Sequence, residues 1–129
     1  MFRLKRAYEP ASPDDGCRIL VERLWPRGVS KDRAAIDLWL KDIAPSAALR
    51  KWYGHDPDRW TEFRRRYWAE LRSDREAVSE LRTKGRGAKV TLVYAAHDEE
   101  HSGALALKQF LSRPKRPAVK KKRSSRNPK

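Results

Sequence analysis

Residues 89–96 read Lys-Val-Thr-Leu-Val-Tyr-Ala-Ala, a nearly unbroken apolar run that begins after Gly87 and ends before Asp98. A short run of this kind, rich in β-branched residues and bounded by turn-forming residues, is typical of a strand buried on both faces. Strands of that type occur mainly in parallel sheets whose faces are covered by helices. The run therefore predicts an α/β fold built around a buried central strand.

Two further strands are predicted near the beginning of the chain. Residues 2–8 alternate apolar and basic side chains, which is typical of a half-exposed strand. Residues 17–24 are largely apolar and end at Pro26 and Gly28. The stretch between these strands is rich in proline, aspartate and glycine and predicts a turn-rich connection.

Four helices are predicted between the second strand and the central one. Ser30 is expected to cap the first, whose apolar residues recur at intervals of three and four up to Pro45. The other three are expected over 46–53, from Asp56 to Leu71, and from a capping-box spacing at Ser73 to Gly85. The stripe of the first helix is Ile36, Trp39, Leu40 and Ile43.

A last helix is expected after the central strand, capped by Asp98, with Ala104, Leu107 and Leu111 on its buried face. The element order is therefore β-β-α-α-α-α-β-α. The long helical crossover between the second and third strands suits a parallel pair. We expect an α/β fold with a small, mainly parallel sheet of about three strands, covered by about five helices.

Charge divides the chain into two parts. The whole sequence has 31 lysines and arginines against 17 acidic residues, and nine of the basic residues but no acidic one fall in 113–129. That stretch has little apolar surface to bury, so we expect one domain over 1–112 and a disordered basic tail. The tail could bind nucleic-acid phosphates without base specificity, or act only as a solvated extension. Its candidate nucleic-acid residues are Lys115, Arg116, Lys120, Lys121, Lys122 and Arg123.

Several classes of protein are not expected. No apolar run approaches the ~18–20 residues of a membrane span, and the first residues lack the apolar stretch of a secretory signal. Cys17 is the only cysteine, which fits a cytoplasmic protein without a disulfide framework. His97 and His101 match a zinc-protease spacing, but they fall at a strand–helix junction with no evident third ligand. The sequence predicts no metal site and no membrane partner, and it leaves the cofactor open.

Ligands of parallel sheets bind beyond the carboxyl ends of the strands. Arg23 and Arg27 follow the second predicted strand, and together they could grip a phosphate or carboxylate, with Gly28 in the same turn. Trp25 between them could stack on a planar ligand. The alternatives are an ion pair between Arg23 and a helix carboxylate, and a core position for Trp25.

The segment after the central strand supplies candidate proton-transfer groups. His101 could donate or accept a proton beside a bound anion, and Asp98 lies close to it in sequence. His55 precedes the expected cap at Asp56 and could face the same cleft. A structural hydrogen bond is the alternative for each histidine.

Several motifs resemble the YeaO-like family of bacterial proteins, a domain of unknown function. The most specific are Arg-Leu-Trp-Pro-Arg-Gly at 23–28 and Gly-His-Asp-Pro at 54–57, and the resemblance covers about 1–111. It implies a small cytoplasmic bacterial protein and no particular activity. The matching motif positions are Arg23, Trp25, Arg27, Gly28, His55, Asp56, Asp98 and His101.

Three functions remain open on the sequence. The first is a small enzyme or binder of an anionic small molecule, held by Arg23 and Arg27 with the histidines nearby. The second is a nucleic-acid-associated protein that binds through its tail. The third is a non-catalytic partner-binding module, which exposed tryptophans, Trp68 above all, would favour.

Overall fold

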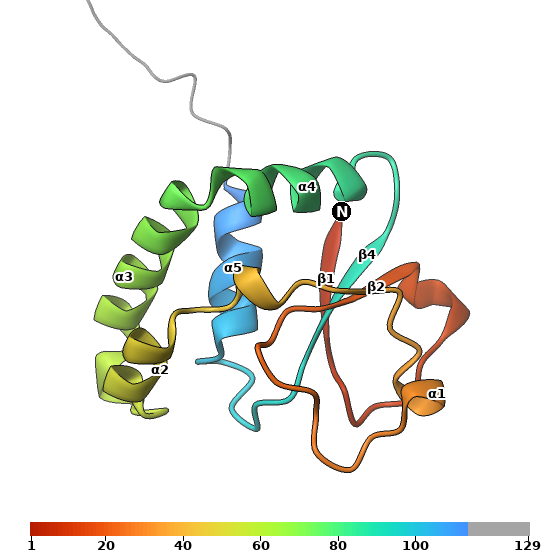
Figure 1. Ribbon diagram of the computed structural model, residues 1–129, viewed down its shortest axis with the longest axis horizontal. Helices are drawn as coiled ribbons and strands as arrows, with labels where there is room; N and C mark the ends of the chain where they lie inside the picture. Colours follow the sequence, from red (N-terminus) through yellow and green to blue (C-terminus); the bar gives the residue numbers. More distant parts are fainter. Residues whose placement is uncertain (114–129) are drawn as a thin grey trace, which may run out of the picture.

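The computed structural model describes residues 1–113, which form one four-stranded sheet with helices against it (Figure 1). The strands are β1 (Phe2–Arg6), β2 (Cys17–Leu20), β3 (Leu38–Trp39) and β4 (Val90–Tyr94), in the order β1-β4-β2-β3. Every pair is parallel, which confirms an α/β fold with a parallel sheet. The expected count of three strands was wrong, because β3 adds a fourth at the edge. The predictions for the basic tail, from residue 114 onward, concern residues outside the part of the chain that the structure describes.

The central position of β4 follows from its apolar sequence. All five of its residues are buried, and it pairs with β1 on one side and β2 on the other. Phe2 of β1 and Cys17 of β2 are both aligned with Val90. Because the three strands are parallel and in step, their carboxyl ends meet at one edge of the sheet.

Four helices cover one face of the sheet and form the main core. They are α2 (Ala47–Tyr53), α3 (Trp60–Ser73), α4 (Arg75–Gly85) and α5 (Gly103–Ser112). None of the helices within residues 1–113 is long and apolar enough to cross a membrane. The largest fully buried side chains of this layer include Phe63, Tyr67, Leu81, Leu92 and Leu107.

A smaller apolar cluster covers the opposite face. Leu20 and Val93 point to this side, and Trp25, Ile36 and Trp39 pack against them. The two indole rings meet edge to face with their centres 5.5 Å apart. The connection between β2 and β3, which includes the short helix α1 (Lys31–Ala34), therefore closes this face without a long helix.

The predicted helix over 30–44 was wrong. Ser30 does cap α1 by accepting a hydrogen bond from the Arg33 N–H, but the helix ends at Ala35, whose φ is 48°. The chain then forms β3, and a short 3-10 turn follows over Lys41–Ile43. The apparent helical stripe is shared between two cores: Ile36 and Trp39 belong to the smaller cluster, whereas Leu40 and Ile43 belong to the main one.

Two smaller expectations also needed correction. The strand predicted over 17–24 ends at Leu20, since the backbone leaves the sheet just after Val21 donates to the Val93 carbonyl. The capping box at Ser73 does not form. That hydroxyl contacts the carbonyl of Ala69, one turn earlier in α3, and α4 begins after Asp74.

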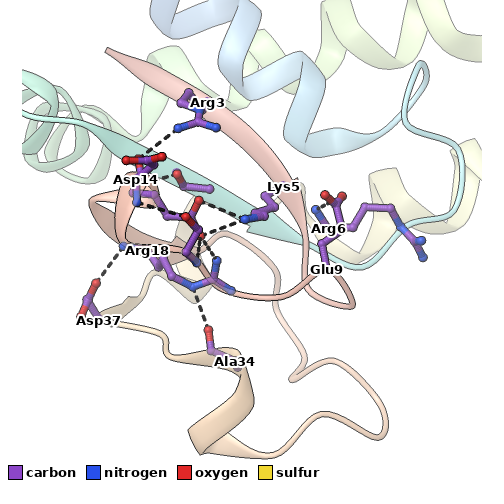
Figure 2. A network of polar contacts seen from close by, with 11 residues as sticks. Arg3, Lys5, Arg6, Glu9, Asp14, Arg18, Ala34 and Asp37 are labelled. Carbon is purple, nitrogen blue, oxygen red and sulfur yellow. Dashed lines mark hydrogen bonds and ion pairs between the residues drawn. The ribbon is translucent and has the colours of Figure 1, made fainter.

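A buried polar network joins the first connection to the sheet. Asp15 is 1% exposed and accepts hydrogen bonds from Lys5 and Arg18 at 3.1 and 2.6 Å. Arg18 also donates from Nε to the carbonyl of Ala34, and its backbone N–H binds the carboxylate of Asp37 (Figure 2). These contacts hold the segments before β2 and after α1 against the second face of the sheet.

Candidate functional site

A cleft of about 520 Å³ opens beyond the carboxyl ends of β2 and β4, the edge at which the sequence predicted a ligand site. Its walls come from residues 21–24 after β2, residues 95–96 after β4, helix α2 and the loop before α5. The polar and charged lining includes Glu22, Arg23, Arg50, Lys51, His55 and His101.

Small side chains leave the space for this cleft. The segment after β4 contributes Ala95 and Ala96, the start of α5 contributes Gly103 and Ala104, and α2 begins with Ala47. Larger residues at these positions would fill the volume between the sheet edge and the helices. The cleft is therefore a consequence of sequence at three separate elements.

His101 lines one wall and is hydrogen-bonded to Asp98, which is not itself among the residues that line the cleft. His101 Nδ1 lies 2.8 Å from Asp98 Oδ2, and Asp98 Oδ1 accepts from the backbone N–H groups of Glu100 and His101. The hydrogen bond from His101 holds the pKa of Asp98 below its usual value. Asp98 thus caps the turn before α5. The expectation that it caps α5 itself was wrong, because Ser102 does so, and His101 precedes the helix.

Two aromatic residues fix the position of His101. The Tyr53 hydroxyl donates to the His101 carbonyl at 2.7 Å, and the Trp60 ring meets the imidazole edge to face at 5.5 Å. Burial, with Asp98 and Asp56 nearby, raises the pKa of Tyr53 to about 12, so its hydroxyl remains a donor. An ionised carboxylate can only accept, so the bond to Asp98 places a proton on Nδ1 and leaves Nε2 as the acceptor of the neutral ring.

His55 reaches the same cleft from the end of α2. Gly54 ends the helix in the left-handed conformation, and His55 keeps that conformation with a φ of 57°. Its ring centre lies 6.2 Å from that of Tyr53. The structure therefore brings His55 and His101 to one cleft from residues 46 positions apart in sequence.

Three basic side chains line the cleft. Arg50 and Lys51 come from the last turn of α2, and the Nε of Arg50 donates to the Pro45 carbonyl at 3.3 Å. Arg23 follows β2, and its Nε is buried without a hydrogen-bond partner among the described residues. It makes no ion pair within 4.0 Å in residues 1–113, although Glu70 and Asp74 line a smaller adjoining hollow of about 140 Å³.

Sequence reasoning missed Glu22, Arg50 and Lys51. Glu22 lay inside the strand predicted to reach residue 24, and burial raises the pKa of its carboxyl, with the Ala95 N–H, Arg50 and His55 opposing that shift. Basic residues in the last turn of a helix are ordinarily explained by the helix dipole, so Arg50 and Lys51 carried no separate signal. The signal that could have identified Glu22 is its position: an acidic residue directly after the apolar residues 19–21.

The remaining predicted positions lie outside the cleft lining. Trp25 packs on the second face, and its indole N–H donates to the Val29 carbonyl at 2.6 Å. Arg27 is exposed, and its carbonyl accepts from the Tyr8 hydroxyl. Gly28 adopts a φ of 79° in the same turn. Arg23 thus lines the cleft without Arg27, and the core position that the sequence left open for Trp25 is the one it occupies.

Comparison with known proteins settles the family. A family model described as "Inactive DUF488-N3 subclade" matches residues 1–128. The protein named YeaO of Escherichia coli is 40% identical over 110 residues, which cover 85% of this chain and 96% of that protein. The chain belongs to the YeaO-like DUF488 family.

Mycobacterial proteins are similar to this YeaO-like protein over the same length. Rv3073c of Mycobacterium tuberculosis and Mb3100c of Mycobacterium bovis are each 46% identical over 110 residues, covering 85% of this chain and 92% of theirs. No solved structure was found to match the chain.

The cleft of this YeaO-like protein combines basic side chains with an oriented imidazole. Guanidinium and ammonium groups are the side chains that pair with anions, and an imidazole held by a carboxylate, as His101 is by Asp98, is a group suited to proton exchange. Within residues 1–113 no serine, threonine or cysteine lines it, and Cys17 lies at the other end of β2. The described residues also contain no group of three side chains that could hold a metal ion.

Proposed function

We propose that this YeaO-like protein binds a small phosphate- or carboxylate-bearing molecule in the cleft. The observation that carries the proposal is the charge of the lining: Arg23, Arg50 and Lys51 face the same space, against Glu22 as the acidic member. Burial raises the pKa of Glu22, which weakens its repulsion of an anion. A positively lined cleft of this size favours a small anionic ligand.

The lining suggests how such a ligand is held. Arg50 and Lys51 at the exposed end of α2 attract the charged group, and the guanidinium of Arg50 keeps its terminal nitrogens free of protein partners in residues 1–113. His101 offers Nε2 as an acceptor for an O–H of the ligand, such as that of a singly protonated phosphate. Phe63 and Ala104 line the apolar side of the cleft, against which the uncharged part of a ligand would pack.

Binding without covalent catalysis fits these residues best. The matching family model carries the word "inactive" in its description. The cleft also has no hydroxyl or thiol of serine, threonine or cysteine among its described lining residues. We therefore assign the His101–Asp98 pair the role of orienting the ligand: Asp98 holds the ring of His101, and Nε2 accepts a hydrogen bond from the ligand, with no chemical step.

Thermal unfolding with candidate ligands tests the proposal. The screen would use inorganic phosphate, pyrophosphate, nucleotides, sugar phosphates and di- or tricarboxylates. A ligand present at ~100 times its dissociation constant stabilises the folded state by about 2.7 kcal/mol. We expect at least one of these anions to raise the midpoint in a concentration-dependent way.

Two arginine variants locate the binding. Arg50→Gln should lower the affinity of such a ligand by roughly tenfold, the loss of about one charge-assisted hydrogen bond. Arg27→Gln should leave it unchanged, since Arg27 lies outside the cleft lining. Equal losses in both variants, or no stabilisation by any anion in the screen, would contradict the proposal.

A partner-binding role finds less support. All five tryptophans are half-buried, and Trp68 donates its indole N–H to the Ala106 carbonyl at 2.9 Å. The large apolar side chains that are exposed within residues 1–113 are Met1, Tyr8 and Leu24.

A further inference from the structure

A second basic surface lies on α3 and the end of α5, formed by residues that do not line the cleft. Trp60, Arg64 and Trp68 follow one another at intervals of four on α3. The guanidinium carbon of Arg64 lies 5.8 Å from the ring centre of Trp60 and 5.2 Å from that of Trp68. Arg113 covers Trp68 as well, at 4.8 Å. We call these four residues the arginine–tryptophan ladder.

The ladder arginines carry unneutralised charge. Neither Arg64 nor Arg113 makes an ion pair among the described residues, and the one side-chain hydrogen bond of Arg64 goes to the amide oxygen of Gln109 at 3.0 Å. Arg64 and Arg113 come from different elements but lie over the same ring of Trp68, and uncompensated guanidinium groups held this close together attract an anion.

Trp52 provides an internal comparison. Arg59 and Arg66 lie over its ring at 5.2 and 4.3 Å, so the same stacking occurs there. Arg66 is paired with Glu62 at 2.7 Å and Arg59 with Asp56 at 3.7 Å. Each arginine over Trp52 therefore has a carboxylate partner, with Glu62 shared between Arg66 and Arg65, whereas the arginines over Trp60 and Trp68 have none among residues 1–113.

Guanidinium donors without protein partners suit a phosphate. A guanidinium over an indole ring makes a cation–π contact, and the donors of Arg64 other than the one bound to Gln109 have no hydrogen-bond partner among residues 1–113. Arg82 extends the pattern, because it lies 5.6 Å from the ring centre of Phe110, which in turn is 6.0 Å from Trp68. Arg82 also makes no ion pair among residues 1–113.

We propose that the arginine–tryptophan ladder binds the phosphate backbone of a nucleic acid. Trp60 and Trp68 are eight residues apart, about 12 Å along a helix, which matches roughly three to four phosphates of one strand. Residues 114–129 add eight lysines and arginines and no acidic residue directly after Arg113. Trp60 contacts His101, but Arg64 and Arg113 do not line the cleft, so the proposal does not rest on the cleft ligand.

Binding of labelled single-stranded and duplex DNA to the full chain tests the ladder, measured by fluorescence anisotropy between ~50 and ~200 mM salt. The test variant is Arg64→Gln with Arg113→Gln. The matched control is Arg59→Gln with Arg66→Gln, which removes the same formal charge from the compensated site over Trp52.

We expect the ladder variant to bind at least tenfold more weakly near ~0.1 M salt, and to lose about 1.4 to 1.8 from the slope of log affinity against log salt, the share of two phosphate contacts. The control should remain within about twofold of the parent. Arg113→Gln alone should give about half the loss of slope, and since Arg113 follows the last helix it leaves the core intact.

Three results would overturn the proposal. In the first, the full chain binds neither DNA. In the second, the ladder variant and the control lose affinity equally. In the third, the ladder variant binds like the parent while replacement of residues 120–123 by glutamine abolishes binding, which would leave the tail as the whole site. An acidic peptide that competes as well as DNA, with the same dependence on Arg64, would reject nucleic acid as the partner.

Discussion

Asp15 shows how a charge can be buried at low cost in this fold. Its carboxylate accepts from Lys5 Nζ, Arg18 Nη1 and the Ser12 N–H, and its carbonyl accepts from the Thr91 hydroxyl. Burial alone would raise the pKa of Asp15, but these hydrogen bonds outweigh it and the pKa is lowered. The carboxylate is thus matched by partners from the sheet and from the first connection.

We expect Asp15→Asn to lower the free energy of unfolding by about 3–5 kcal/mol at neutral pH, because it leaves the guanidinium of Arg18 buried without its counter-charge. Urea unfolding measures this loss. Asp14→Asn is the matched control, since the neighbouring carboxylate is exposed and should change stability by less than about 0.5 kcal/mol.

The pH dependence follows from the sign of the shift. A lowered pKa in the folded state means that the stabilisation by Asp15 is present above the unfolded value near ~3.9 and is lost as pH falls through the folded value. The difference in stability between the parent and Asp15→Asn should therefore shrink below about pH 4. A difference that is independent of pH would contradict the assignment of the effect to this carboxylate.

Residue-scale prediction succeeded where a motif sits at a strand end and failed where the path of a loop decides. His55, His101 and Arg23 were expected near one another, and all three line the cleft. Arg27 is only four residues from Arg23, but the turn at 26–29 places it outside the cleft. Trp25 packs against Trp39, a contact between two segments that could not be predicted from the sequence alone. That His55, His101 and Arg23 contact a ligand is still a prediction.

At the scale of elements, capping residues predicted the helices correctly, whereas the spacing of apolar residues alone did not. The helices expected after Asp56 and Ser46 were found because Ser46 and Gly54 mark both ends of α2, and Asp56 followed by Pro57 opens the turn into α3. The helix expected over 30–44 failed because spacing of three and four fits both a helix and a chain that alternates between two cores. An edge strand as short as β3 has too few residues to show its own period.

The start of α5 gives a test at this scale. Ser102 is buried and its hydroxyl accepts from the Leu105 N–H at 3.1 Å, so Ser102→Ala should cost about 1 kcal/mol of unfolding free energy. Asp98→Ala, which affects a turn outside the helix, should cost less. Chemical denaturation of both variants measures the difference. A larger loss for Asp98→Ala would restore Asp98 as the helix cap.

The whole molecule presents two basic regions in different places. One is the cleft at the carboxyl edge of the sheet, and the other is the arginine–tryptophan ladder on the helical layer. The parallel sheet and its ligand edge could be predicted because the buried pattern of β4 demands covered faces. The ladder could not, since it depends on how α3 and the end of α5 meet in space.

The central claim is that the cleft binds an anion, and amide chemical-shift mapping with pyrophosphate tests it most directly. We expect saturable shifts at residues 22–24, 50–51, 95–96 and 101–103, all beside the cleft, that are reduced in Arg50→Gln and retained in Arg27→Gln. Shifts that fail to saturate, or that fall on the ladder while the cleft amides stay unchanged, would contradict the account.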